Sequence, residues 1–342
     1  MSDFVDLPDL ACEAFGGAAI ACNDEFFAEK DNLVREAAAV WKDHLYTDRG
    51  KWMDGWETRR RREPGDDWVI VRLAAPAVVR GVIVDTAHFT GNYPPAAALD
   101  GTTGLGYPSA PELAAADWSP LAPKAGLRGD HANELAVTGP DRLVTHVRLT
   151  IYPDGGVARL RVHGEVVPDP RWLGGRPDLA ALLAGGQVAD CSNMFYASPA
   201  NVLSPGRAAF MSDGWETSRR RDDGNDWLVV RLAAPAVLHE AVIDTSRFVG
   251  NAPGRARLTD AETGAELLAE TPLVPDTEHR FRLAAAPPAG LVRLDIYPDG
   301  GISRLRLPGV IPAASRGPLA QRWLSLLPPG TASQVDQRDF FS

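Results

Sequence analysis

The sequence is poor in cysteine and has no long hydrophobic run. Its 342 residues include three cysteines, Cys12, Cys22 and Cys191, and none of them belongs to a Cys-x-x-Cys pair. An odd number of widely spaced cysteines predicts neither a disulfide framework nor a zinc-thiolate site. No stretch approaches the roughly 18 apolar residues of a membrane span, and the first residues lack the basic and apolar regions of a secretory signal. We therefore expect a cytoplasmic protein that is not inserted in a membrane.

Positive charge is also scarce. The chain has 35 Lys and Arg against 45 Asp and Glu, which gives a net charge of -10. This balance argues against general binding to nucleic acid or to an anionic membrane face, so a bound anion would need a local cluster of cations. The sequence also lacks a His-Glu-x-x-His motif, a phosphate-binding Gly-rich loop and a Gly-x-Ser-x-Gly elbow. These absences remove the main support for a zincin, a P-loop nucleotidase or a serine hydrolase.

The chain does contain an internal duplication. Pro8-Asp9-Leu10-Ala11 returns at 177–180, Asp54-Gly55-Trp56-Glu57-Thr58 at 213–217, and Ile151-Tyr152-Pro153-Asp154-Gly155-Gly156 at 296–301. The offset falls from 169 (177 minus 8) to 159 (213 minus 54), which places a length change in the loop around Lys42 to Lys51. We predict one domain at 1–170, a second at 171–330 and a C-terminal tail at 331–342.

Each copy is predicted to be a β-sandwich. Residues 68–73 and 78–84 are rich in β-branched side chains and read as adjacent strands joined by a turn at 74–77. Residues 143–151 and 157–162 are predicted to form a hairpin around Pro153-Asp154-Gly155-Gly156. Helical patterns are brief, at 32–41 and 177–184. The short strands and frequent turns favour an all-β fold of two tandem antiparallel sandwiches over a parallel α/β sheet.

The densest group of candidate site residues follows the first Trp of the repeated motif. Asp54, Glu57, Arg59, Arg60 and Arg61 lie within eight positions. Guanidinium groups suit bidentate binding of a carboxylate, while the two acids could orient the arginines or transfer protons. The second copy repeats the pattern with Asp213, Glu216 and Arg220. A solvated, charged loop is the alternative for this segment.

A second block, Asp85-Thr86-Ala87-His88-Phe89-Thr90-Gly91-Asn92, follows a predicted strand and should lie on a loop at one end of the sandwich. His88 could act as an acid or base near pH 7, or could be a structural side chain. Asp85 could serve the site or could cap the loop backbone. The second copy keeps Asn251 in place of Asn92 but has Arg247 in place of His88. The third block, at 151–156, is compatible with turn chemistry alone, although Arg159, Arg161, Arg304 and Arg306 could still reach a shared cleft.

These motifs together resemble those of the allantoicase family. The resemblance rests on Lys51 to Arg62, Asp67-Trp68, Asp85 to Asn92 and Ile151 to Arg161, and it extends over both copies. It implies two jelly-roll domains resembling galactose-binding modules, assembled into a homo-oligomer. It also implies an allantoate amidinohydrolase, which converts allantoate and water to ureidoglycolate and urea in purine and allantoin degradation. Arg247 departs from the family pattern, in which His is common in the second repeat.

The substrate chemistry suggests a role for each candidate. Allantoate carries one carboxylate and two planar ureido groups on one carbon. Glu57 or His88 would transfer the proton and Asp54 would orient or activate water. The residues that would bind substrate in the first repeat are Arg59, Arg60, Arg61, Asp85 and Asn92. Their counterparts in the second repeat would form a second site or complete the first, and they are Asp213, Glu216, Arg220 and Asn251. No cofactor is required by these patterns, and a divalent metal such as Mn²⁺ is left open. The alternatives are a non-catalytic module that binds a small organic anion or a sugar, and a hydrolase of a related ureide such as ureidoglycolate.

Overall fold

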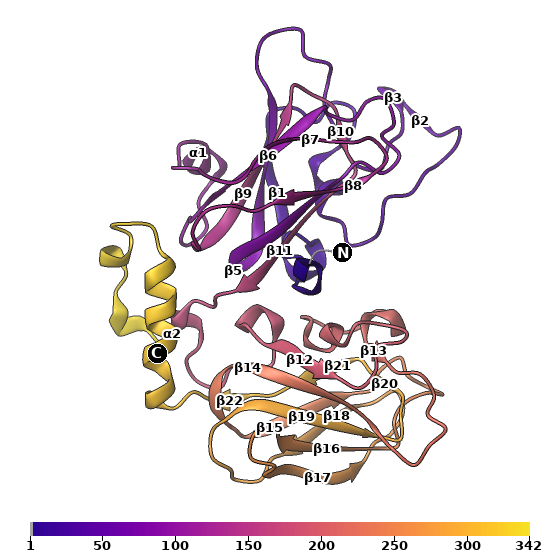
Figure 1. Ribbon diagram of the computed structural model, residues 1–342, viewed down its shortest axis with the longest axis vertical. Coiled ribbons are helices and arrows are strands. Elements are labelled where there is room, and N and C mark those ends of the chain that lie inside the picture. Colours follow the sequence, from indigo (N-terminus) through magenta and orange to yellow (C-terminus); the bar gives the residue numbers. More distant parts are fainter. Residues whose placement is uncertain (1–2) are drawn as a thin grey trace. The chain divides into compact units, whose positions relative to one another are not determined.

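The computed structural model describes residues 3–342 and contains two compact units built from antiparallel sheets. The first unit runs to Val167 and also includes Leu326–Thr331, and the second comprises Pro168–Ser325 and Ala332–Ser342. Figure 1 shows that strands dominate both units. The prediction of an all-β fold with two jelly-roll sandwiches is confirmed.

In the first unit, one sheet has the order β1-β5-β9-β6-β7, and the other is formed by β8 and β11 on either side of β5. Two short strand pairs, β2 with β3 and β4 with β10, complete the unit. The strands are β1 Ala18–Cys22, β2 Tyr46–Thr47, β3 Gly50–Lys51, β4 Trp56–Glu57, β5 Asp67–Asp85, β6 Ala96–Thr102, β7 Ser119–Gly126, β8 Ala132–Ala136, β9 Val144–Tyr152, β10 Gly156–Val157 and β11 Arg159–Val166.

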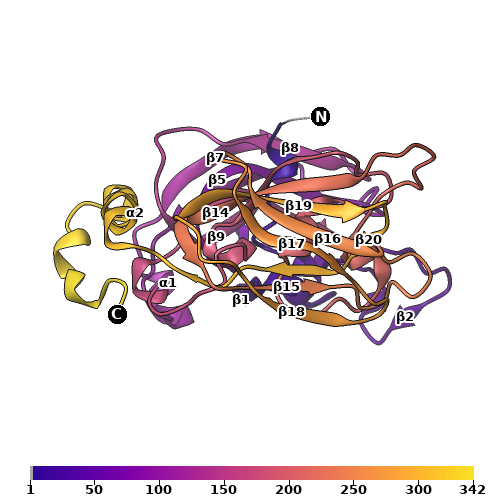
Figure 2. The same ribbon diagram turned by 90° about the horizontal axis from the view of Figure 1, so that it is seen from below.

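The second unit repeats this plan. Its larger sheet has the order β12-β14-β19-β16-β17, and its smaller sheet has the order β18-β15-β21. Figure 2 shows β15 and β18 in a layer separate from β14, β16, β17 and β19. The strands are β12 Gln187–Cys191, β13 Trp215–Glu216, β14 Asp226–Leu238, β15 Glu240–Asp244, β16 Arg255–Asp260, β17 Glu266–Pro272, β18 Glu278–Arg282, β19 Ala289–Tyr297, β20 Gly301–Ile302, β21 Arg304–Arg306 and β22 Gly309–Val310.

Helices are few and short. The α-helices are α1 Ala110–Ala114 and α2 Ala313–Leu326. None of the helices in residues 3–342 is long and apolar enough to cross a membrane. The 3₁₀ turns are η1 Asp3–Asp6, η2 Glu13–Phe15, η3 Lys30–Val34, η4 Pro170–Trp172, η5 Leu182–Ala184, η6 Pro199–Leu203, η7 Met211–Asp213, η8 Ala332–Gln334 and η9 Gln337–Asp339.

Two local predictions about strand pairing are wrong. Residues 67–72 of β5 pair with β9 in one sheet, whereas 77–85 pair with β11 in the other, so the two predicted strands do not pair with each other. Pro76 has no N–H to donate, and the β5–β9 register breaks between Arg72 and Ala77. The predicted hairpin also fails, because the turn at 153–156 carries the chain from β9 in one sheet to β11 in the other.

The predicted helices at 32–41 and 177–184 are reduced to the short turns η3 and η5. The reason is visible for the first of them. The carbonyl groups of Arg35, Glu36 and Ala37, which a helix would use internally, accept hydrogen bonds from Arg161 and Arg159 instead.

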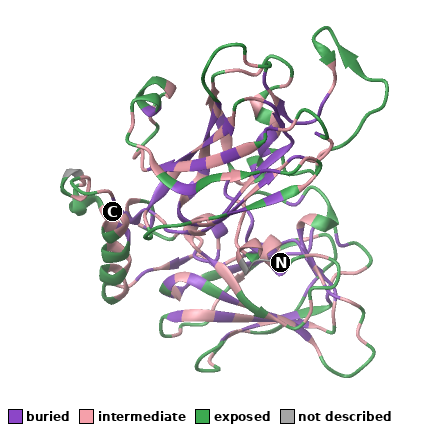
Figure 3. Ribbon diagram, turned by 45° about the horizontal axis from the view of Figure 1, so that its top comes forward, coloured by how far each residue is buried: buried purple, intermediate pink, exposed green. Residues whose placement is uncertain are grey.

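Alternate side chains of the sheets fill the core of each sandwich, as the buried residues in Figure 3 indicate. Val69, Val84 and Leu149 are fully buried in the first unit. Complete burial of such a side chain contributes about 1.5–3 kcal/mol, so the two-residue alternation of the strands provides most of the driving force for the fold.

The predicted site of the length difference is confirmed. In the first unit, the segment between Trp41 and Trp52 contains the exposed β2–β3 hairpin. The corresponding part of the second unit contains only the turn η7 in its last residues and no strand pair. A surface loop absorbs such an insertion without disturbing the sheets.

Candidate active site

The repeated Trp-Glu dipeptide forms a two-residue strand at one end of the sandwich. In β4, Glu57 pairs with Gly156 of β10 on one side and bridges to Ala28 on the other. Trp56 is fully buried, and its indole Nε1 donates to the carbonyl of Asp24 at 2.7 Å. A side chain at Gly156 would collide with the ring of Phe89, so glycine is required for this close approach. The backbone that presents Glu57 is therefore held on both edges.

Glu57 forms a hydrogen-bonded pair with Asn92. The side-chain amide of Asn92 donates to Oε1 of Glu57 at 2.7 Å. The backbone carbonyl of Asn92 accepts from the Gly156 N–H at 2.7 Å. Burial raises the pKa of the Glu57 carboxyl, and the hydrogen bond from Asn92 offsets only part of that rise. Within residues 3–342, neither Oε2 of Glu57 nor Oδ1 of Asn92 has a hydrogen-bond partner. Two polar atoms of the pair are thus left for a ligand.

The second unit contains the same pair. The side-chain amide of Asn251 donates to Oε1 of Glu216 at 2.6 Å, and the backbone carbonyl of Asn251 accepts from the Gly301 N–H at 2.9 Å. Glu216 pairs with Gly301 across β13 and β20, as Glu57 pairs with Gly156. The structure therefore brings together the glutamate and the asparagine that the sequence analysis selected in separate blocks, and it does so in both copies.

The three candidate arginines of the first unit have different surroundings. Arg59 forms an ion pair with Asp24 at 2.6 Å. Arg61 forms one with Asp67, also at 2.6 Å, and its backbone N–H donates to Asp154. Arg60 is exposed and has no ion pair or side-chain hydrogen bond within the part of the chain that the structure describes. Of the three, the side chain of Arg60 is the most available to an anion.

The same separation recurs in the second unit. Arg220 forms ion pairs with Asp226 at 2.8 Å and with Asp222 at 2.9 Å, and its backbone N–H donates to Asp299. Arg219, the counterpart of Arg60, is exposed and has no side-chain partner among residues 3–342.

Asp54 lies in a buried ion pair with Arg159. Its Oδ2 accepts from Arg159 at 3.0 Å and from the Val40 N–H at 2.9 Å. Burial favours the neutral acid, but the hydrogen bonds from Arg159 and Val40 outweigh it and lower the pKa of Asp54. Arg159 is 1% exposed and also donates to the carbonyls of Ala37, Asp54 and Ala158. These contacts tie the loop before β4 to strand β11.

Asp213 does not reproduce this arrangement. Its carboxylate accepts from the backbone N–H groups of Ala209 and Phe210, at 2.7 and 3.0 Å, and so closes its own turn. Arg304, the counterpart of Arg159, donates to the backbone carbonyl of Asp213 at 2.6 Å. The two aspartates occupy equivalent positions with different partners.

His88 and Arg247 each contact a backbone carbonyl at the equivalent place in their units. Nε2 of His88 lies 3.1 Å from the carbonyl oxygen of Ala39, and Nε of Arg247 donates to the carbonyl of Ala208 at 3.2 Å. Both residues have a left-handed backbone, with φ of 68° and 74°. The backbone N–H of His88 donates to Asp130 at 2.8 Å. Both side chains therefore bind the loop that precedes the Trp-Glu strand.

Asp85 caps the backbone of the loop that it begins. Its Oδ1 accepts from the Ala87 N–H at 2.9 Å, and Asp244 accepts from the Ser246 N–H at 2.8 Å in the same way. The arginines of the third block also bind loops. Arg161 donates to the backbone carbonyls of Arg35 and Glu36. Arg306 donates to backbone carbonyls in the segment 202–206.

The sequence analysis did not select the two aromatic residues, Phe26 and Phe27, whose segment lies along the strand that carries Glu57. The backbone N–H of Phe27 donates to the carbonyl of Glu57, and the rings of Phe26 and Phe27 meet edge to face at 5.1 Å. Arg49, from the turn of the β2–β3 hairpin, donates to the carbonyl of Phe26 at 2.9 Å. The recurrence of Phe26 as Phe195 was the available signal for this feature.

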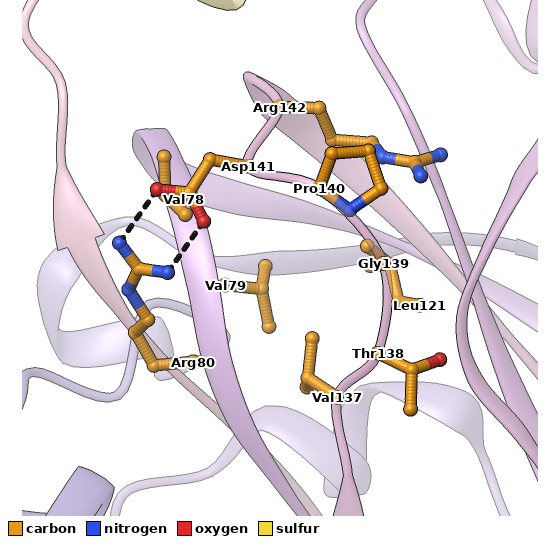
Figure 4. A pocket seen from close by; sticks show the side chains of 10 residues that line it. All are labelled: Val78, Val79, Arg80, Leu121, Val137, Thr138, Gly139, Pro140, Asp141 and Arg142. Carbon is orange, nitrogen blue, oxygen red and sulfur yellow. Dashed lines mark hydrogen bonds and ion pairs between the residues drawn. The ribbon is translucent and has the colours of Figure 1, made fainter.

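A pocket in the first unit lies elsewhere. Val78, Val79 and Leu121 form part of its wall, and Arg80 and Asp141 lie at its edge (Figure 4). Arg80 forms ion pairs with Asp141 at 2.6 Å and with Glu165 at 2.8 Å, so its charge is already neutralised. Arg80 lies at the register shift between β5 and β11, whereas Asp85 is at the end of β5 that leads to the candidate site. The pocket contains none of the predicted site residues.

No group of three or more His, Cys, Asp and Glu side chains among residues 3–342 is arranged to hold a metal ion. The side chains around Glu57 explain this, since Asp54 is occupied by Arg159 and the nearest partner of Glu57 is an amide. The donor set does not fit a Mn²⁺ site, which needs several oxygen or nitrogen ligands.

A family model described as an allantoicase repeat matches residues 8–167 and 177–312. This chain belongs to the allantoicase family. An allantoicase relative from Nocardia farcinica, named "Probable allantoicase", is 55% identical over 313 residues, which cover 90% of this chain and 95% of the relative. A relative of the same name from Streptomyces avermitilis is 46% identical over 341 residues, covering 94% and 90% of the two chains.

Solved allantoicase structures show the same architecture. The allantoicase crystal structure from Saccharomyces cerevisiae has a TM-score of 0.74 at 32% identity and covers 88% of this chain and 92% of its own. A second allantoicase structure has a TM-score of 0.75 at the same identity and coverage. The family resemblance inferred from the motifs is confirmed.

Proposed function

We propose that this chain hydrolyses allantoate to ureidoglycolate and urea, and that the Glu57–Asn92 pair of the first repeat carries the reaction. Membership of the allantoicase family supports the reaction, with relatives matching along nearly the whole chain. The observation that supports the site is a half-buried carboxyl with a raised pKa, held by an amide and left with one free oxygen. Enzymes use such a carboxyl as a general acid.

The geometry suggests how the substrate is held. Arg60 follows Glu57 by three residues, so the two Cα atoms are within about 10 Å even in an extended backbone. Its free guanidinium can bind the carboxylate of allantoate in a bidentate manner while a ureido group lies against Glu57. The free Oδ1 of Asn92 can accept from a ureido N–H. Arg59 and Arg61, already paired with Asp24 and Asp67, hold the loop in place.

Glu57 can act first as acid and then as base. Because Oε1 accepts from Asn92, the proton of neutral Glu57 resides on Oε2. Transfer of that proton to one ureido nitrogen lets its bond to the central carbon break, and urea leaves. The lone pair of the second ureido nitrogen forms a cationic C=N bond. Water adds to the carbon and returns a proton to the Glu57 carboxylate, which completes ureidoglycolate and restores the acid.

The first experiment is turnover by the purified chain treated with EDTA. We expect urea and ureidoglycolate in equal amounts, with no further gain on adding Mn²⁺, because the residues around Glu57 do not form a metal site. Rescue by Mn²⁺ would show that the proposed chemistry lacks a component. A folded chain that does not hydrolyse allantoate but does hydrolyse ureidoglycolate would contradict the proposed reaction. A cytoplasmic homo-oligomer is part of the same proposal, to be tested by light scattering and by localisation of a tagged chain.

The pH dependence of turnover should report on the Glu57–Asn92 pair. Since the acid form of Glu57 is required and its pKa is raised, kcat/KM should fall as the pH rises through that pKa. Asn92→Asp replaces the donor with a second carboxylate and raises the pKa of Glu57 further, so the falling limb should move to higher pH. The measurement is the pH profile of urea release, and an unmoved limb would contradict the assignment.

His88→Arg should retain turnover. The second repeat uses Arg247 for the contact that His88 makes, so an arginine at 88 can bind the Ala39 carbonyl and preserve the loop. We expect kcat within about threefold of the parent chain, whereas loss of a general base would cost about 10²-fold or more. A loss of that size in a folded His88→Arg chain would restore His88 as the proton-transfer residue.

A further inference from the structure

The Glu216–Asn251 pair of the second unit matches the pair in the first unit. The hydrogen bond is 2.6 Å in one and 2.7 Å in the other, and in both units the asparagine carbonyl accepts from the glycine N–H of the facing two-residue strand. In the described part of the chain, Oε2 of Glu216 and Oδ1 of Asn251 have no partner, and Arg219 is exposed without one. Two acceptors and a free guanidinium three residues away form a complete set for a ureido group and a carboxylate.

Several of the contacts that hold loops differ between the repeats. The ion pair of Arg59 with Asp24 is replaced by a neutral hydrogen bond from Asn193 to Ser218 at 2.8 Å. His88 is replaced by Arg247, and the two aspartates of the repeated motif have different partners. The glutamate, the asparagine and the unpaired arginine are unchanged. The Glu–Asn pair and the exposed arginine are thus retained together while several neighbouring contacts have changed, as expected if the retained residues bind a ligand.

The aromatic pair next to the second Trp-Glu strand is more exposed than the pair next to the first. The rings of Phe195 and Tyr196 meet edge to face at 4.8 Å, as Phe26 and Phe27 do. They are 70% and 64% exposed, against 40% and 36% for the first pair. In the first unit, Arg49 of the β2–β3 hairpin and Arg59 both lie over the Phe26 ring and cover it. The backbone N–H of Tyr196 donates to the carbonyl of Glu216, so this exposed ring pair is attached to the strand that carries the proposed site, and exposed aromatic rings suit a planar ureido group.

We propose that Glu216, Asn251 and Arg219 form a second ureide-binding site, so that one chain binds two ureido-carboxylate anions. This inference rests on the proposed function, because the ligand class is taken from the reaction assigned to the first repeat. The second site lies within one unit and needs no residue of the first.

The test is calorimetric titration of the full chain with ureidoacetate, which has the carboxylate and one ureido group but lacks the leaving group of allantoate. We expect two molecules bound per chain. Asn251→Ala combined with Arg219→Met should weaken one site at least tenfold, and Asn92→Ala combined with Arg60→Met should weaken the other. All four side chains are at the surface or bind only within the pair, so the variants should fold, which circular dichroism checks.

A stoichiometry of one that responds only to the Asn92 and Arg60 substitutions, with normal hydrolysis of allantoate, would overturn the second site and leave the proposed function intact. Two bound molecules that do not respond to the Asn251 and Arg219 substitutions would also overturn it. Two bound molecules that respond as expected, from a chain that does not hydrolyse allantoate, would uphold the second site and reject the proposed function.

Discussion

Replacing Glu57 with glutamine is expected to lower kcat for urea release by about 10²–10⁴-fold, the usual contribution of a general acid. The substitution keeps the shape of the side chain and the hydrogen bond from Asn92 to Oε1. It removes the proton that the proposed mechanism transfers to the leaving ureido nitrogen. Because the substitution leaves the proposed binding groups of Arg60 and Asn92 in place, KM should change much less than kcat.

The matched control is Glu63→Gln, which removes the same charge from an exposed glutamate six residues further along. It should retain the parent kcat. The measurement is initial-rate kinetics of urea release on samples whose thermal unfolding is unchanged. If Glu57→Gln kept about half of kcat, turnover would be shared between the repeats. If it kept nearly all of kcat, the assignment of the acid would be wrong.

Replacing Asp54 with asparagine is expected to destabilise the first unit by about 3–5 kcal/mol, the usual result of leaving a buried charge without its partner. Arg159 is 1% exposed and lies 3.0 Å from the Asp54 carboxylate. Asparagine keeps the volume and one acceptor oxygen but cannot neutralise the guanidinium. Urea unfolding, followed by circular dichroism and by total tryptophan fluorescence, measures the loss.

Asp213→Asn is the natural comparison, because that carboxylate accepts only from backbone N–H groups and is half-buried. Its cost should be below about 1 kcal/mol, since the amide oxygen can still accept a hydrogen bond. Equal losses for the two variants would refute the structural role of the Asp54–Arg159 pair. A stable Asp54→Asn chain without turnover would instead return Asp54 to the catalytic group.

The same pair predicts a direction for acid sensitivity. The pKa of Asp54 is lower in the folded chain than in the unfolded one. Its contribution to stability is therefore fully present above the unfolded pKa and is lost as the pH falls through the folded pKa. The stability difference between the parent and Asp54→Asn should shrink below about pH 4, where the unfolded carboxyl also becomes protonated.

The repeated motifs were sufficient to predict the family, the all-β architecture and the location of the extra loop. These features could be predicted because each depends on a short sequence pattern. The patterns are the alternation of β-branched residues, the Pro-Asp-Gly-Gly turns and the doubled Asp-Gly-Trp-Glu-Thr segment. The same local view misplaced the pairing of residues 67–85. Their two halves look like neighbours in sequence, yet each gains more by pairing with a distant strand in a different sheet.

The sequence by itself determined which residue types are available: carboxylates, an amide, a histidine and a run of arginines in two copies. Only the tertiary structure decided which of them are occupied. Charge and hydrogen-bonding capacity are properties of a residue, but their satisfaction depends on partners more than a hundred positions away, as with Asp54 and Arg159. The long-range contacts occupy Asp54, Asp85 and His88 with the scaffold, and they leave Glu57, Asn92 and Arg60 with groups free for a ligand.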